Sequence, residues 1–227
     1  MCGRYILTHS AAEIAHQFGL TTIPELTPRY NIAPSQPVAI VTGERQLQFA
    51  RWGLIPPWAK DKAISSKLIN ARAETLSEKP SFREAFKHRR CLILADGFYE
   101  WQGVGKKKQP YCIRLEDERL FAFAGLWESW RGEGELIDSC TIITTNANDS
   151  IRPIHDRMPV ILPPAAYETW LAPTSSRPDL QSLLVPIESD RLKSFPVSTL
   201  VNSPAHDRPE LLSPLTSLRS FIDGDSK

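Results

Sequence analysis

The chain has 227 residues, of which 41% are hydrophobic and 23% are charged, which is ordinary for a globular protein. No apolar run approaches the roughly 18 residues that a membrane-spanning helix needs, which argues against an integral membrane protein. The first ten residues place a single arginine before only three apolar residues, so we expect no secretory signal and a cytoplasmic protein.

The net charge of +1 hides an asymmetry between the two halves of the chain. Through Arg114 there are 17 Lys and Arg against 9 Asp and Glu, whereas from Leu115 onward there are 10 against 17. The basic half also contains Trp52, Trp58 and Trp101. Cations for phosphates and rings for bases are what a single-stranded nucleic acid needs, although an ordinary solvated basic face remains an alternative.

Local patterns predict many short strands and few helices. Residues 10–19 form a helix that Ser10 caps, Glu13 completes as a capping box and Gly19 ends. Three further helices are predicted at residues 79–87, 163–171 and 178–184. Strands are predicted at residues 37–41, 47–52, 91–101, 111–115, 120–127 and 140–145.

This pattern predicts an α+β fold: one domain built on a barrel-like, strongly bent, mostly antiparallel sheet with a few flanking helices. No linker or repeat divides the chain, and 19 prolines punctuate it throughout. We expect residues 1–222 to form the domain, residues 223–227 to be a frayed tail, and the protein to be a monomer.

The four cysteines stand at positions 2, 91, 112 and 140, without CxxC or zinc-ligand spacing, so no metal and no cofactor is predicted. Cys91, Cys112 and Cys140 lie in apolar runs and are expected to be buried thiols. Cys2 differs, because removal of Met1 would leave an α-amine and a thiol on adjacent carbons. Such an aminothiol condenses with an aldehyde, first as a Schiff base and then as a thiazolidine. The alternative is an inert residue on a frayed terminus.

Seven motifs that follow one another along the chain favour a reactive role for Cys2. They are MCGRY at the start, RYNIAPSQ (29–36), RWGLIPPWAKD (51–61), INARAET (69–75), ADGFYEW (95–101), IHDRMPVIL (154–162) and PVSTLVNSP (196–204). In this order and spacing the chain resembles the SRAP family, the SOS-response-associated peptidase or abasic-site processing proteins. The resemblance implies a barrel-like α+β domain that binds abasic sites in single-stranded DNA and crosslinks to them through the N-terminal cysteine.

Carried over residue by residue, the resemblance makes Cys2 the nucleophile, has Asn70 position the reacting groups, and has Glu100 and His155 move protons. The positions that the resemblance assigns to DNA contacts are Arg4, Asn31, Arg72, Trp101 and Arg157, and the basic half adds Trp52. The resemblance also implies a protein that associates with the nucleoid when it is bound to DNA, and a possible self-removal of Met1. The loop around Trp58 matches the family pattern less closely.

The chemistry of these residue types agrees with the implied roles. An imidazole, with an ordinary pKa near 6.5, exchanges protons at neutral pH. In a strand, Glu100 shares a face with Phe98, while Tyr99 and Trp101 face the other way. Each residue also has a plain alternative: Glu100 as a strand-edge charge, His155 as a turn cap, and Asn70 with Arg72 as a structural polar pair.

Three other functions compete with the abasic-site hypothesis. Class II glutamine amidotransferases also begin with Met-Cys-Gly, but this chain lacks a recognisable Asn-Gly oxyanion pair. A peptidase could use the same Cys2, Glu100 and His155 on Met1 or on other peptides. A binding module for DNA ends or junctions would need no covalent step at all.

Overall fold

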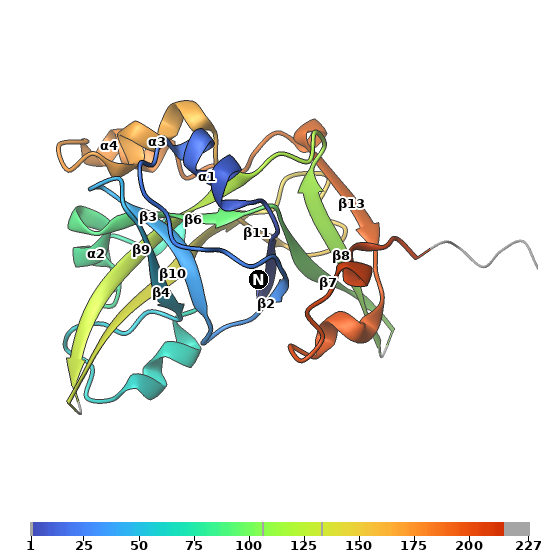
Figure 1. The fold of residues 1–227 in the computed structure, drawn as a ribbon, viewed down its shortest axis with the longest axis horizontal. Coiled ribbons are helices and arrows are strands. Elements are labelled where there is room, and N and C mark those ends of the chain that lie inside the picture. The colour runs from blue at the N-terminus through green and yellow to red at the C-terminus, as the bar shows by residue number, and fades with distance from the viewer. Residues whose placement is uncertain (1, 106, 133, 216–227) are drawn as a thin grey trace, which may run out of the picture.

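Five strands close into a barrel in the computed structural model, which describes residues 2–105, 107–132 and 134–215. They are β3 (Pro37–Thr42), β4 (Leu47–Trp52), β6 (Arg90–Ala95), β9 (Phe121–Gly132) and β10 (Glu135–Asn146). The order β10-β4-β3-β6-β9 returns to β10, which pairs with both β4 and β9 (Figure 1). Only the β10–β4 pairing in this ring is parallel. The predicted barrel-like α+β fold is confirmed.

The barrel interior is filled by aromatic and small side chains from alternate strand positions. Tyr5 lies edge-on to Trp52 and Phe123, at centroid distances of 5.3 and 5.8 Å. Gly125 of β9 leaves room for the Ile93 side chain, because a Cβ there would lie only 2.8 Å from it. All four cysteines are buried, which confirms the expectation for Cys91, Cys112 and Cys140.

A second, antiparallel sheet stands against the barrel and has the order β13-β8-β7-β1-β2 (Figure 1). Its strands are β1 (Arg4–Leu7), β2 (Arg29–Ile32), β7 (Gly97–Val104), β8 (Lys107–Leu115) and β13 (Leu192–Pro196). The sequence patterns missed β1, β2 and β13, which are short. They matter because β1 carries the N-terminal end of the described chain into this sheet.

The strand predicted at residues 91–101 is two strands, β6 and β7, separated by Asp96. Asp96 donates its N–H to the carbonyl of Ile6 at 2.8 Å. Its fully buried carboxylate accepts hydrogen bonds from the backbone and hydroxyl of Thr8, and lies 2.7 Å from Nδ1 of His9. The chain therefore leaves the barrel at Asp96 and enters the second sheet, a change that apolar periodicity does not reveal.

Four helices flank the strands: α1 (Ala11–Phe18), α2 (Arg83–His88), α3 (Tyr167–Leu171) and α4 (Arg177–Ser182). The predicted capping box of α1 is present, with Ser10 and Glu13 bonded reciprocally and Gly19 left-handed. The other helices are shorter than predicted, since residues 79–82 and 164–166 form turns and 3-10 structure. Arg90 joins two of them to the barrel by donating to the carbonyls of Phe86 and Trp170.

Short elements complete the fold and carry several site residues. The short strands are β5 (Asn70–Arg72), β11 (Arg157–Pro159) and β12 (Ile161–Leu162). The 3-10 turns are η1 (Lys62–Lys67), η2 (Ala73–Thr75), η3 (Pro164–Ala166), η4 (Ser189–Arg191), η5 (Thr199–Asn202) and η6 (Pro209–Leu212). The tail predicted at 223–227 lies outside the described residues. Within the described ranges, no helix has the length and apolar character needed to cross a membrane.

The Asp96 junction generates a stability prediction. We expect Asp96→Ala to lower the free energy of unfolding by roughly 2–4 kcal/mol, because the Thr8 and His9 donors lose a buried acceptor. Urea unfolding measures the change. The control Asp117→Ala, at a more exposed carboxylate, should stay within about 0.5 kcal/mol of the parent. Equal behaviour of the two variants would contradict the importance of this junction.

Candidate functional site

Cys2 lies just before β1, which pairs antiparallel with β7 in a register that sets Arg4 opposite Tyr99. Glu100 and Trp101 follow Tyr99 in β7, and the charge of Glu100 acts on the Cys2 thiol. The carbonyl of Cys2 accepts a hydrogen bond of 2.9 Å from Nδ2 of Asn70. The start of the chain is therefore held by both a sheet and a side chain.

The Cys2 side chain is fully buried, unlike that of a residue on a frayed terminus. It packs with Tyr5 and other core residues of the barrel. Its Sγ is directed at the carbonyl of Arg4, 3.8 Å away. Burial, and then the charge of Glu100, raise the pKa of the Cys2 thiol well above its ordinary value.

Glu100 is also buried, with 3% of its surface exposed. The predicted strand faces are confirmed, because Phe98 belongs to the barrel core while Tyr99 and Trp101 belong to a second apolar cluster. Glu100 is thus not a strand-edge charge. Its Oε1 accepts a 3.2 Å hydrogen bond from the backbone of Trp101, and its charge acts on Cys2.

Asn70 belongs to β5, a three-residue strand parallel to β10 with Asn70 opposite Ile142. Its Nδ2 holds Cys2, while its buried Oδ1 has no hydrogen-bond partner among the described residues. A buried acceptor without a donor is unfavourable, and such atoms often mark a place where a ligand or catalytic group binds. Asn70 therefore offers one acceptor beside the Cys2 backbone.

His155 lies in the turn before β11. Its Nδ1 is 3.0 Å from the backbone N–H of Arg157 and 2.8 Å from Oδ1 of Asp156. One nitrogen cannot accept from the first and donate to the second at once, so the two contacts correspond to Nδ1 without and with a hydrogen. Gln102, two residues after Glu100, donates to the carbonyl of Pro153 at 2.9 Å and ties this turn to β7. His155 thus makes the contact expected of a turn cap, and its turn also lies next to the strand that carries Glu100.

Arg4 and Asn31 are engaged with η5 and the residues after it. Arg4 donates to Oδ1 of Asn31 at 2.9 Å and to the carbonyls of Val201 and Asn202 at 2.6 and 2.9 Å. Asn31 is fully buried and donates to the carbonyls of Val201, Ser203 and His206. In this structure the Asn31 amide lies inside the protein and holds this segment, and its contact with DNA stays a prediction.

The two predicted tryptophans differ in exposure. Trp52 is fully buried and donates from Nε1 to the carbonyl of Ile69 at 2.9 Å, a position that does not support its predicted contact with DNA. Trp101 is half-buried and donates from Nε1 to Oδ1 of Asn202 at 2.8 Å. Arg72 is exposed two residues beyond Asn70, and the Trp58 side chain is 58% exposed.

Arg157 forms a hub inside the protein. Its two terminal nitrogens bind the carboxylate of Glu74 at 2.6 and 2.9 Å, and they also donate to Oδ1 of Asn146 and the carbonyl of Thr144. This guanidinium joins η2, which follows β5, to β10 and β11. Its contact with DNA stays a prediction. Glu74 was missed by sequence reasoning, although it lies in the same INARAET motif as Asn70.

A family model described as SOS response associated peptidase (SRAP) matches residues 1–204. The chain belongs to the SRAP family. The abasic site processing protein YoqW of Bacillus subtilis is 49% identical, over 93% of this chain and 99% of that protein. HMCES of Xenopus tropicalis, also named an abasic site processing protein, is 36% identical over 76% of this chain and 58% of its own. A crystal structure from Bacteroides thetaiotaomicron covers 95% of this SRAP chain and all of its own, with TM-score 0.88 and 30% identity.

The Glu74–Arg157 pair predicts a pH-dependent contribution to stability. The hydrogen bonds from Arg157 lower the pKa of Glu74 below its ordinary 4.5. A lowered pKa in the folded state stabilises the protein above pH 4.5 and loses that effect as the pH falls through the lowered value. We therefore expect Glu74→Gln to reduce the melting temperature at pH 7, with a difference from the parent that shrinks toward pH 3.

Thermal unfolding between pH 3 and pH 8 checks this expectation. Glu25→Gln, at an exposed carboxylate, serves as the matched control and should follow the parent throughout. A melting-temperature difference for Glu74→Gln that does not change with pH would contradict the role of the ion pair.

Proposed function

We propose that this SRAP protein recognises abasic sites in single-stranded DNA and binds them covalently through Cys2 after removal of Met1. The observation that carries the proposal is the arrangement of Cys2, Asn70 and Glu100, in which an amide holds the Cys2 backbone and a buried carboxylate acts on the same residue. The names of the relatives, abasic site processing proteins, agree with this arrangement.

Removal of Met1 is required by the chemistry, because the nitrogen of Cys2 is an unreactive amide until that bond is hydrolysed. The freed amine attacks the aldehyde carbon of the ring-opened abasic sugar and gives a carbinolamine. Loss of one water produces a Schiff base. The thiol then adds to the same carbon, its proton passes to the nitrogen, and a thiazolidine closes.

The environment of Cys2 favours this order of events. With a raised thiol pKa, the sulfur stays protonated at neutral pH and the amine is the first nucleophile. Glu100 is the group that accepts the ammonium proton, and the orphaned Oδ1 of Asn70 accepts a hydrogen bond from the amine. His155 supplies the acid for opening the sugar ring and for dehydrating the carbinolamine, since an imidazole can exchange protons at neutral pH.

The DNA strand is held by the exposed groups next to these residues. Arg72 lies two residues from Asn70, and Trp101 follows Glu100 with its ring half-exposed. Together they provide a cation for a phosphate and a ring for a base, which bind without sequence preference. Arg4 and Arg157 support the site from within the protein, where their hydrogen bonds lie.

The nucleophile is tested by mass spectrometry of the intact protein after incubation with an abasic oligonucleotide. We expect the parent protein to lose Met1 and to gain the oligonucleotide mass minus one water. Cys2→Ala should give no thiazolidine yet bind the strand with an affinity within about threefold. Cys112→Ala, another fully buried thiol, should crosslink like the parent.

An adduct of normal yield and stability on Cys2→Ala would overturn the proposal. Glutamine hydrolysis without any adduct would instead favour the amidotransferase alternative, and tight binding without an adduct in the parent would favour a non-covalent module. The same mass spectrum reports whether Met1 leaves when no aminopeptidase is present. That result would support the peptidase activity in the family's description.

Glu100 is tested by the rates of adduct formation and release. We expect Glu100→Gln to slow both by roughly 10²-fold or more, because one carboxylate takes the ammonium proton and later returns a proton to the adduct. Single-turnover gels that follow adduct formation and adduct release measure the two rates. Release at the parental rate would remove Glu100 from the mechanism.

A further inference from the structure

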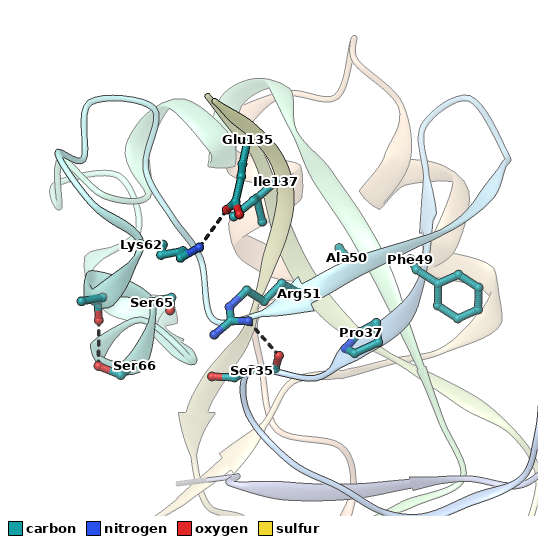
Figure 2. A pocket seen from close by; sticks show the side chains of 11 residues that line it. Ser35, Pro37, Phe49, Ala50, Arg51, Lys62, Ser65, Ser66, Glu135 and Ile137 are labelled. Carbon is teal, nitrogen blue, oxygen red and sulfur yellow. Dashed lines mark hydrogen bonds and ion pairs between the residues drawn. The ribbon is translucent and has the colours of Figure 1, made fainter. Parts of the chain in front are cut away.

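A hollow of about 650 Å³ lies on the outside of the barrel, between β4 and η1 (Figure 2). We call it the β4–η1 hollow. Its polar lining includes Ser35, Arg51, Lys62, Ser66 and Glu135, and its apolar lining includes Phe49. This volume is within the range of sites that bind small ligands. None of its lining residues belongs to the Cys2 site.

Cations lie at one end of this hollow and a ring at the other. Phe49 and Arg51 are two apart on β4 and therefore share a face, and Figure 2 shows Lys62 on the far side of Arg51 from Phe49. The Phe49 side chain is 46% exposed, which is unusual for a phenylalanine in a barrel strand. A ring beside cations is the combination that binds one nucleotide by its base and phosphate.

Arg51 is oriented but not neutralised. Its Nη1 donates to the carbonyl of Ser35 at 3.1 Å, and its buried Nε has no acceptor among the described residues. Ser35 itself has a left-handed backbone, with φ of 72°. The guanidinium is thus held in place by a neutral group.

Lys62 spans the hollow to Glu135, at 2.8 Å. Both side chains are about half exposed, at 44% and 51%, and exposed ion pairs of this kind contribute little to stability. A phosphate can therefore replace the Glu135 carboxylate at Lys62 at small cost. An occupant without a negative charge cannot displace Glu135 from Lys62 and is therefore disfavoured.

The hollow and Asn70 lie on one stretch of chain. Ser65 of η1 lines the hollow, the backbone N–H of Leu68 donates to the carbonyl of Ser65, and β5 begins at Asn70. On the other side, Trp52 follows Arg51 and donates to the carbonyl of Ile69. The wall of the hollow is thus joined through residues 65–70 to the residue that holds Cys2.

We propose that the β4–η1 hollow is a subsite for one nucleotide of the strand that flanks the abasic lesion, with the base against Phe49 and the phosphate between Arg51 and Lys62. The inference rests on the proposed function for its substrate class. It adds that the protein contacts the strand beyond the lesion, on one side only, so affinity depends on the length of that flank.

The test compares abasic oligonucleotides that carry a single nucleotide on each side with ones extended on the 5′ or the 3′ side. For the parent, extension on one side should tighten binding, whereas extension on the other side should not. Phe49→Ala should lose roughly tenfold in affinity for the extended strand. Arg51→Gln should weaken binding of the same strand and reduce the dependence of the affinity on salt concentration. Both variants should crosslink the short substrate at the parental rate when protein is saturating.

The matched controls are Val185→Ala and Arg83→Gln, at an exposed apolar residue and an exposed arginine away from the hollow. Both variants should keep the full increase in affinity that extension of the strand gives the parent protein. Phe49→Tyr keeps the ring and should keep the gain as well, which separates stacking from a folding defect. A 2-aminopurine in the flank should be quenched by the parent protein and not by Phe49→Ala.

An unchanged gain from extension in Phe49→Ala and Arg51→Gln would overturn the inference, as would an equal loss for short and extended strands. Failure of the parent protein to crosslink the short substrate would count against the proposed function instead. The length series on undamaged strands still reports on the hollow in that case, because it requires no crosslink.

Discussion

The site depends on holding the first residues of the chain in one place. Chain termini normally fray, yet here β1 lies between β2 and β7 in the middle of a sheet, and Asn70 binds the carbonyl of Cys2. These contacts restrict the conformational freedom of Cys2 before any substrate binds. In the proposed function, where Cys2 becomes both the terminus and the nucleophile, this restriction lowers the entropic cost of the reaction.

The same arrangement places polar groups where an apolar core would be more stable. The carboxyl of Glu100 and Oδ1 of Asn70 are buried beside Cys2, and the latter has no donor among the described residues. Such groups weaken a fold unless something binds them. They lie beside a buried thiol of raised pKa. Buried polar groups of this kind reduce stability and are typical of functional sites.

Several arginines of the basic half serve the interior rather than a nucleic-acid surface. Arg90 donates to carbonyls near the ends of two helices, and Arg4 holds the segment from Val201 onward. Arg157 does similar work in the other half of the chain, paired with Glu74. Counting charges along the sequence therefore overstates the cations available to DNA. Arg72, two residues from Asn70, is a cation that stays exposed.

Sequence reasoning recovered the barrel-like class, the capped helix α1 and most barrel strands, because alternation and capping are local properties of the chain. The motifs also selected Cys2, Asn70 and Glu100, and the structure brings these three residues together. Sequence reasoning predicted one strand at residues 91–101, where Asp96 separates β6 from β7, and it missed β1 and β2. Short strands take their identity from their neighbours more than from their own residues.

What the sequence alone determined was the inventory of reactive groups: a cysteine at position 2, a carboxyl in an aromatic strand, and an asparagine in a polar motif. Only the tertiary structure decided which of these groups are accessible. Trp52 and Asn31 turned inward, whereas Phe49 stayed outside. Burial and pairing are set by contacts between residues far apart in the chain, and no local pattern of residues encodes them.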